Sequence, residues 1–250
     1  MFECLNSWII MAAEKGLSNK IYTIFHILNY AVALIYTIWY GYKTKIGLKK
    51  TFYILLITFP LIYLWMLVLY WISSGFREFG GQNMVMVFVY VPIIALGVSK
   101  IVKVRWVDEC YYHAASLPLL HSFGHLGCVF TGCCSGFEST WGIYNIITGK
   151  LLFPIQLIES IVSLTVTAIL IIRSHRHKYE ADEKQFPLML VLYGSLRFLC
   201  EFFRDNDKIL MGCSSLSFHA LFMCIVGAVW LGVIYRRERR RSTVEKKNID

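Results

Sequence analysis

The chain has 250 residues, of which 57% are hydrophobic and only 16% are charged, and its formal net charge is +9. Because soluble domains are about 45–50% apolar and about 25% charged, this composition excludes a water-soluble fold, a disordered chain and a collagen-like chain. Eight cysteines are too few for a small scaffold held by disulfides. The chain is therefore predicted to be an all-α, multi-pass membrane protein with a single transmembrane domain over residues 1–250.

Seven apolar segments approach or exceed the length of about 20 residues that a helix needs to cross a bilayer. In chain order they are residues 21–42, 51–72, 81–98, 112–131, 153–172, 186–203 and 216–235. The first is too long, and begins too far from the N-terminus, to be a cleaved signal peptide. The basic segment 236–250 follows the last helix directly. This position is typical of a cytoplasmic tail on an anionic membrane surface, and it argues against nucleic-acid binding.

The positions of the basic residues predict how these segments are oriented. If the segments alternate across the membrane, 18 of the 25 lysines and arginines lie on one side and six on the other, while Arg197 lies within a span. Cytoplasmic loops of membrane proteins carry an excess of Lys and Arg. We therefore expect the N-terminus outside and the C-terminus in the cytoplasm.

The fourth segment leads into a stretch rich in glycine and cysteine. His121, His125 and Cys128 are four and three residues apart, so they share one face of a helix. His121 is expected to be a histidine of the core. The imidazole of His125 can act as a base, as a phosphate partner when protonated, or as a metal ligand.

The C-x4-C-C spacing of Cys128, Cys133 and Cys134 allows three interpretations. Zinc sites usually contain C-x2-C pairs and a fourth ligand, so no metal is predicted here. Thiol–disulfide exchange centres usually contain C-x-x-C, although other spacings occur. The third interpretation is a compact loop at the edge of the bilayer, which the neighbouring Gly132 and Gly136 favour.

One face of the fifth segment carries Gln156, Glu159, Ser160 and Ser163. A carboxylate within an apolar helix is costly unless it is paired, so Glu159 is expected to counter Arg197 or to accept a proton. A polar face that joins helices and a face that lines a catalytic cavity both fit this pattern.

The sixth segment carries a charged stripe, formed by Gly194, Arg197, Glu201 and Arg204. Arg197 and Glu201 are four residues apart and can form an ion pair on one helical face. The stripe predicts either a structural ion pair between helices or a site for an anionic headgroup, because arginine binds phosphate oxygens with two parallel hydrogen bonds.

Three motifs, in this order, make the chain similar to the prolipoprotein diacylglyceryl transferase family of bacterial inner-membrane enzymes. Residues 124–128, followed by 132–136, resemble the family's Gly-Arg-x-Gly-Asn/Cys stretch and its Gly-Cys-Cys-Tyr-Gly ending. Residues 153–159 resemble the motif His-Pro-x-Gln-Leu-Tyr-Glu, and residues 193–204 match Tyr-Gly-x-x-Arg-Phe-x-x-Glu-Phe-x-Arg completely. The likeness extends over residues 78–207.

The resemblance implies transfer of a diacylglyceryl group from phosphatidylglycerol to the thiol of a lipobox cysteine in a prolipoprotein, with release of glycerol phosphate and without a cofactor. It also implies a site in the outer half of the bacterial inner membrane. The expected catalytic residues are Arg197 as a phosphate clamp, Glu201 to orient it, and His125 to assist the phosphate or the thiol proton. The expected substrate-binding residues are Arg204, Gly132, Gly136, Gln156, Glu159 and Tyr193, with Gln156 and Glu159 lining the cavity.

Two departures from the family pattern keep other functions open. The family's loop arginine is His125 here, and its third-segment histidine, a candidate base, has no counterpart in residues 80–92. A histidine is charged only below about pH 6.5, so the expected hold on phosphate is weaker. One alternative is a membrane thiol–disulfide oxidoreductase that uses Cys128, Cys133 and Cys134. The other is a catalytically inactive, lipid-binding homologue.

Overall fold

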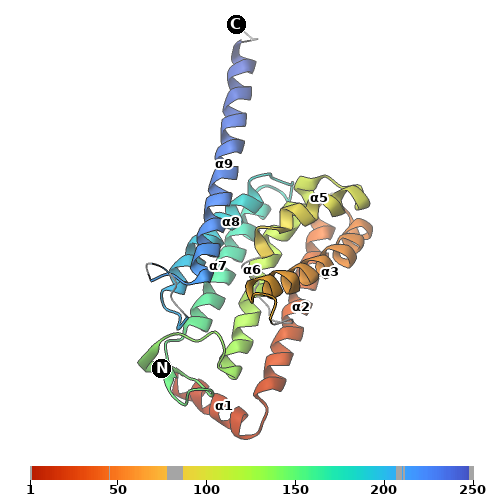
Figure 1. The fold of residues 1–250 in the computed structure, drawn as a ribbon. Helices are drawn as coiled ribbons and strands as arrows, with labels where there is room; N and C mark the ends of the chain where they lie inside the picture. Colours follow the sequence, from red (N-terminus) through yellow and green to blue (C-terminus); the bar gives the residue numbers. More distant parts are fainter. Residues whose placement is uncertain (1, 45, 78–86, 207–209, 211, 248–250) are drawn as a thin grey trace.

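A computed structural model describes residues 2–44, 46–77, 87–206, 210 and 212–247, and this part of the chain is mostly helical. Its helices are α1 (Glu3–Glu14), α2 (Ser18–Lys43), α3 (Leu48–Ser73), α5 (Val91–Val102), α6 (Trp106–Thr131), α7 (Ile155–Arg176), α8 (Gln185–Glu201) and α9 (Ser215–Lys247) (Figure 1). A short antiparallel pair, β1 (Glu138–Tyr144) and β2 (Leu151–Leu152), lies between α6 and α7. The predicted all-α class holds for the membrane part, and the hairpin is an addition that the sequence did not indicate.

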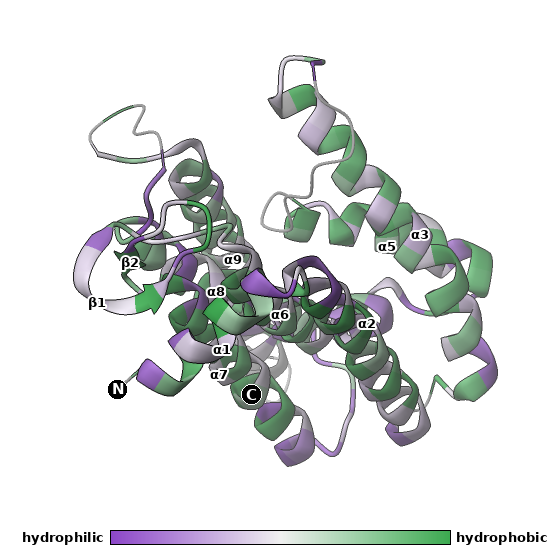
Figure 2. Ribbon diagram, turned by 90° about the horizontal axis from the view of Figure 1, so that it is seen from below, coloured by the Kyte–Doolittle hydropathy of each residue, from purple (hydrophilic) through white to green (hydrophobic). Residues whose placement is uncertain are grey.

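The apolar segments expected from the sequence coincide with helices of the structure. Four helices among the described residues, α2, α3, α7 and α9, are long and apolar enough to cross a membrane. In the third expected segment, residues 81–86 lie outside the described residues, and the remainder leads into the shorter helix α5. Figure 2 shows hydrophobic residues over most of α2, α3 and α5, with hydrophilic residues at helix ends and in loops. The chain is therefore a multi-pass membrane protein.

Helix α6 lies at the centre of the helix assembly. It packs against α2, α7, α5 and α8, and most of its 26 residues are buried in the protein. Because its surface meets other helices instead of lipid, it can carry histidine, serine and cysteine side chains that a lipid-facing helix would not tolerate. This position explains why its sequence is a weaker membrane-span signal than those of its neighbours.

Helices α8 and α9 pack very closely at Gly194. A Cβ atom at this position would lie 2.9 Å from the backbone oxygen of Ala220 and 2.9 Å from the backbone nitrogen of Cys224. Only glycine therefore allows the two backbones to approach at this point. The close packing fixes the side of α8 on which Arg197 and Glu201 lie.

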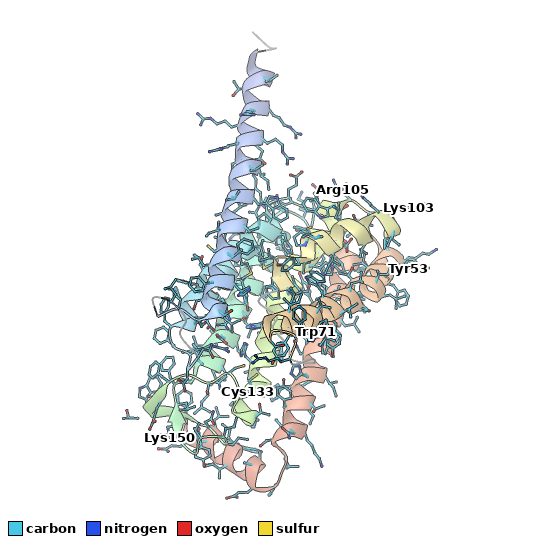
Figure 3. All side chains as sticks on the ribbon, in the orientation of Figure 1. Tyr53, Trp71, Lys103, Arg105, Cys133 and Lys150 are labelled. Carbon is cyan, nitrogen blue, oxygen red and sulfur yellow. The ribbon has the colours of Figure 1, made fainter. Side chains whose placement is uncertain are left out.

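The two ends of the helix assembly differ. At one end, Asn6 of α1 donates to the backbone oxygen of Gly142 at 3.1 Å and accepts from the backbone nitrogen of Tyr144 at 2.9 Å, which joins α1 to β1. Figure 3 shows Lys150 at this end, and Lys103 and Arg105 at the opposite end, toward which the C-terminal part of α9 extends. Helix α1 was not expected from the sequence, because its 12 residues are too few for a membrane span.

Candidate active site

The beginning of α7 places a polar face inside the protein. Pro154 precedes the first helical residue, where its missing N–H costs little. The resulting register buries Gln156, Glu159, Ser160 and Ser163 together. The expected polar face is therefore present and faces neighbouring helices, with Glu159 at its centre.

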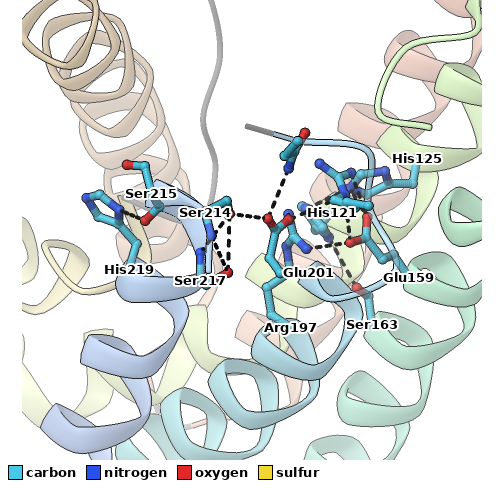
Figure 4. A network of polar contacts seen from close by, with 12 residues as sticks. His121, His125, Glu159, Ser163, Arg197, Glu201, Ser214, Ser215, Ser217 and His219 are labelled. Atoms are coloured by element: carbon cyan, nitrogen blue, oxygen red, sulfur yellow. Dashed lines mark hydrogen bonds and ion pairs between the residues drawn. The ribbon is translucent and has the colours of Figure 1, made fainter. Parts of the chain in front are cut away.

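Glu159 contacts three basic side chains that come from different elements (Figure 4). Arg197 of α8 donates from Nη1 to Oε1 at 2.5 Å. Arg204, just after α8, donates from Nε to Oε1 at 3.1 Å and from Nη2 to Oε2 at 2.9 Å. Nε2 of His125 on α6 lies 3.1 Å from Oε2. The contact with Arg197 was expected from the sequence, whereas those with Arg204 and His125 were not.

Glu201 forms the second acidic centre of the network. Its Oε1 lies 2.7 Å from Nη2 of Arg197, which is the i, i+4 ion pair that the sequence indicated. Its Oε2 accepts hydrogen bonds from Oγ of Ser214 at 2.6 Å and from Nδ2 of Asn206 at 3.0 Å. Ser214 and Asn206 are polar contacts that sequence reasoning missed, because they lie in the connection to α9, where no helical spacing relates them to Glu201.

The charges of this network balance one another. Arg197 and Arg204 are each at least 94% buried, and Glu159 and Glu201 are almost completely buried. Buried ions are stable only when they are paired and hydrogen-bonded, and removal of one partner typically costs about 3–5 kcal/mol. Each arginine contacts both glutamates, so the four side chains stabilise one another as a unit.

His121 and His125 form a contact within α6. Their Nε2 atoms are 2.9 Å apart, and Nδ1 of His121 lies 3.2 Å from Oγ of Ser163. At this distance only one of the two Nε2 atoms carries a hydrogen. The two imidazoles are therefore not both in the charged form, in which each ring nitrogen is protonated. His121, expected to be an ordinary core histidine, is thus part of the polar network. Its four-residue spacing from His125 was the signal that could have identified it.

A cavity of about 480 Å³ lies beside the network. Its polar end is lined by His121, His125, Cys128, Cys134, Arg197 and Arg204. Its other walls include apolar and aromatic side chains from α2, α3 and the residues before α5, among them Tyr22, Tyr30, Phe59, Met66 and Phe88. A cavity of this size, with a charged end and apolar walls, can hold a headgroup and part of the hydrocarbon of an amphiphilic ligand.

Several of the expected substrate-binding residues do not line the cavity but contact the residues that do. Contrary to expectation, Gln156 and Glu159 are not among the described residues that line the cavity. Glu159 lies behind the arginines, and Nε2 of Gln156 donates to the backbone oxygen of Cys133 at 3.0 Å. Tyr193 is buried and packs edge-on against the ring of His121, with the ring centroids 5.4 Å apart. These side chains position the residues that reach the cavity.

Two glycines shape the loop after α6. Gly132 ends the helix with a φ of +73°, a left-handed conformation that glycine adopts without strain. Nδ2 of Asn145 donates to its backbone oxygen at 2.7 Å. At Gly136, a Cβ atom would lie 2.6 Å from the backbone oxygen of Phe153. The left-handed turn at Gly132 and the close backbone approach at Gly136 both require glycine. The resulting loop brings Cys133 and Cys134 back toward the cavity.

The eight cysteines are free thiols. Hydrogen bonds from the Cys128 and Cys133 thiols lower the pKa of the Cys134 thiol well below its usual value, and the positive charge of Arg204 acts in the same direction. Cys134 is therefore the thiol of this cluster that most readily becomes a thiolate.

The fold and the site together define a multi-pass membrane protein whose helices surround a cavity with two arginines at its polar end. The sequence profile of the prolipoprotein diacylglyceryl transferase family matches residues 10–234. The chain belongs to the prolipoprotein diacylglyceryl transferase family, and the members of this family are enzymes. The resemblance carried by the three sequence motifs is thereby confirmed.

Three relatives are named phosphatidylglycerol–prolipoprotein diacylglyceryl transferase. The one numbered 2 from Clostridium perfringens is 28% identical over 186 residues, which make up 70% of each chain. The relative from Clostridium tetani is 30% identical over 120 residues, or 45% of this chain and 47% of the relative. The relative from Campylobacter hominis is 31% identical over 127 residues, or 48% of this chain and 43% of the relative.

Proposed function

We propose that this protein transfers a diacylglyceryl group from phosphatidylglycerol to the lipobox cysteine of a prolipoprotein in the bacterial inner membrane. One observation carries the proposal: Arg197 and Arg204 converge on a cavity whose remaining walls are largely apolar. The donor has the matching structure, since it joins a phosphate to hydrocarbon chains. The names of the three relatives give the same donor and acceptor.

The phosphate of the donor is proposed to bind at the two arginines. Arg197 and Arg204 both line the cavity, and Nε of Arg197 is buried without a hydrogen-bond partner among the described residues. An unpaired buried donor costs free energy unless a ligand satisfies it. A phosphate oxygen is a suitable acceptor, because arginine binds phosphate through parallel hydrogen bonds. The acyl chains then lie along α2 and α3.

The reaction is a substitution at a glyceryl carbon. The acceptor sulfur forms a C–S bond to the glyceryl carbon that carries the phosphate ester, while the C–O bond to phosphate breaks. The electron pair of that bond leaves with the phosphate oxygen, and the proton of the acceptor thiol finally resides on the released glycerol phosphate. The role of Arg197 and Arg204 is to stabilise the negative charge that develops on the leaving oxygen.

The remaining polar residues are proposed to position these arginines. Glu201 orients Arg197 through its 2.7 Å ion pair. Glu159 holds both guanidinium groups and one ring nitrogen of His125. His125 lines the cavity and is proposed to assist the phosphate or the thiol proton.

The same proposal includes seven membrane spans, an outside N-terminus and a cytoplasmic C-terminus. The basic part of α9 extends from the end of the helix assembly where Lys103 and Arg105 lie, which supports a cytoplasmic location for that end. Residues 236–250 would then form the cytoplasmic tail of a single transmembrane domain. The site would lie nearer the outer surface, toward α1 and β1. Accessibility of single engineered cysteines in the loops to a membrane-impermeant reagent tests this orientation.

The direct test of function is transfer by the purified protein in phosphatidylglycerol vesicles. A lipobox peptide should acquire a labelled diacylglyceryl group, and the same peptide with serine in place of cysteine should not. Bound donor without product would contradict the transferase and support the inactive, lipid-binding alternative. Reduction of a disulfide-bonded peptide by the free thiols of the protein, with formation of a disulfide among Cys128, Cys133 and Cys134 and without transfer, would support the oxidoreductase alternative.

A further inference from the structure

A second group of side chains lies at the polar end of the cavity, next to the arginines. One ring nitrogen of His125 and the sulfurs of Cys128 and Cys134 lie within 4.8 Å of one another. His125 and Cys128 are three positions apart on α6, and Cys134 follows the left-handed turn at Gly132. The turn brings a loop sulfur to the face of the helix on which the other two residues lie.

The orientation of His125 is that of a metal ligand. Its Nε2 lies 2.9 Å from Nε2 of His121 and 3.1 Å from Oε2 of Glu159, so a proton on Nε2 is directed to these two acceptors. Its Nδ1 is buried and has no hydrogen-bond partner among the described residues. Histidines that bind metals usually donate their other N–H to a carboxylate, which leaves the free nitrogen unprotonated for the metal. Glu159 provides such a carboxylate.

We infer that His125, Cys128 and Cys134 form a site for one thiophilic divalent metal ion of the Zn²⁺ class, with a fourth position open to the cavity. Zinc binds thiolate at about 2.3 Å and imidazole nitrogen at about 2.0–2.1 Å, so its tetrahedral donors are separated by about 3.5–3.8 Å. The three donor atoms need to move by only about 1 Å to reach these separations. All three residues line the cavity, which leaves room for a ligand from that side.

The cysteine spacing alone predicts no metal site. The pattern C-x4-C-C differs from C-x2-C because its first cysteine lies on a helix and its last lies beyond a glycine turn. The proposal therefore departs from the sequence expectation on geometric grounds. Cys133 is not required as a ligand, since its sulfur lies 3.2 Å from Oγ1 of Thr131.

The open position suits the thiol of the acceptor cysteine, and this part of the inference rests on the proposed function. A thiol that binds a divalent metal loses its proton, and the resulting thiolate is the nucleophile that substitution requires. The sulfur then attacks the glyceryl carbon, the C–O bond to phosphate breaks, and the thiol proton ends on the released glycerol phosphate. The metal would thereby take the place of the family's third-segment histidine, a candidate base that has no counterpart in residues 80–92.

The metal site is tested first without any reaction. Protein freed of metal by a chelator and titrated with Co²⁺ should bind one equivalent, with the sulfur-to-cobalt charge-transfer and visible bands of a tetrahedral site. Cys128→Ala and Cys134→Ala should each lower the affinity for Co²⁺ by at least about tenfold, whereas Cys4→Ala, in the exposed part of α1, should leave it unchanged. Binding without sulfur-to-cobalt bands, or binding that Cys4→Ala weakens equally, would overturn the site.

A measurement on the unaltered protein covers the case in which a variant does not fold. Zn²⁺ should protect Cys128 and Cys134 from alkylation, detected by mass spectrometry, and should leave the alkylation of Cys4 unchanged. Equal alkylation of all three with and without Zn²⁺ would reject the site. A Cys128–Cys134 disulfide that persists in the presence of reductant and Zn²⁺ would reject it as well.

The role of the fourth position is tested with the lipobox peptide. The cysteine peptide should shift the visible bands of the Co²⁺ protein, and the serine peptide should not. The chelator should stop transfer, and Zn²⁺ should restore it. Transfer that continues in metal-free protein overturns the metal's role but leaves the proposed function intact. Co²⁺ binding with normal bands, in a protein that transfers nothing, supports the site and contradicts the proposed function.

Discussion

The two sides of the cavity are built differently. The side formed by α6, α7 and α8 is buried in the protein and held by charged contacts between helices. The α3 side is largely apolar, and α3 exposes Phe52, Leu56 and Leu64 on its outer surface. A buried polar contact joins the two sides, since Oγ1 of Thr58 donates to Oε1 of Glu109 at 3.0 Å. Under the proposed function, this difference assigns the phosphate and the reacting groups to the charged side and the hydrocarbon of the donor to the apolar side.

The largest expected effect is that of Arg197→Ala on the charged side. The variant loses a phosphate contact and leaves Glu159 and Glu201 without one of their partners, so the transfer rate should fall by about 10³-fold. The rate is measured as labelled diacylglyceryl group incorporated into the lipobox peptide. Arg105→Ala, which removes only an exposed ion pair with Asp108, should keep the wild-type rate. Full turnover by Arg197→Ala would remove Arg197 from the proposed site.

Glu159→Gln tests whether the balance of buried charges stabilises the charged side of the cavity. In the variant, two buried guanidinium groups lose one of the two negative charges that pair with them. The free energy of unfolding should therefore decrease by about 3–5 kcal/mol. Thermal unfolding in detergent measures the change as a lower Tm. Glu138→Gln, which breaks an exposed pair with Lys150, should not alter Tm. An equal Tm for Glu159→Gln and wild type would show that the arginines are stabilised in another way.

His125→Arg separates two interpretations of the same position. The substitution restores the arginine of the family motif but removes a metal ligand, so the metal inference predicts a transfer rate reduced by about 10–100-fold. His177→Arg, at an exposed position outside the site, is the control. A faster rate in His125→Arg would instead show that this position serves to hold phosphate.

Gln156→Ala should have a smaller effect, because it removes one hydrogen bond to the cysteine loop. If the hydrogen bond stabilises the loop position by about 1 kcal/mol, its loss corresponds to about a fivefold lower transfer rate. The alkylation rate of Cys134 should increase, because the loop is held less firmly. Gln185→Ala is a matched control, since Nε2 of Gln185 also donates to a backbone oxygen, that of Leu170, at 2.8 Å. If both variants accelerate alkylation equally, the effect is a general loss of stability.

The smallest effect is expected on the apolar side. Phe59→Ala removes an aromatic wall of the cavity and should raise KM for a long-chain donor by about fivefold or less, with little change for a short-chain donor. Phe52→Ala, on the outer face of α3, should change neither value. An equal change of KM for both donors would place the hydrocarbon elsewhere.

The accuracy of the sequence predictions depended on how local each contact is. The pair Arg197–Glu201 was predictable, because helical periodicity brings residues four apart together. The contacts of Glu159 with Arg204 and His125 join three elements, and only folding shows that α6 and the end of α8 meet on the same side of α7. The helical segments were likewise predictable from apolar length.

Other parts of the site required the structure for a different reason. Ser214 satisfies Glu201 from a connection that lacks any periodic pattern. Helix α1 and the hairpin β1–β2 are joined by contacts such as that of Asn6 with Gly142, which no local sequence signal reveals. Gln156 was expected to line the cavity, but it is not among the described lining residues, and its side chain instead contacts the backbone of the cysteine loop.

Because α9 is long, a small tilt of the helix displaces its two ends by several times the movement near its middle. Its 33 residues form one helix about 50 Å long, so a tilt of about 5° around its middle displaces each end by about 2 Å. Ser214, the residue just before this helix, holds Glu201. About two thirds of the way along α9, Arg237 pairs with Glu183, and Nζ of Lys184 lies 2.8 Å from Oε2 of Glu238. These surface pairs therefore restrain, from a distance, the geometry of the carboxylate that orients Arg197.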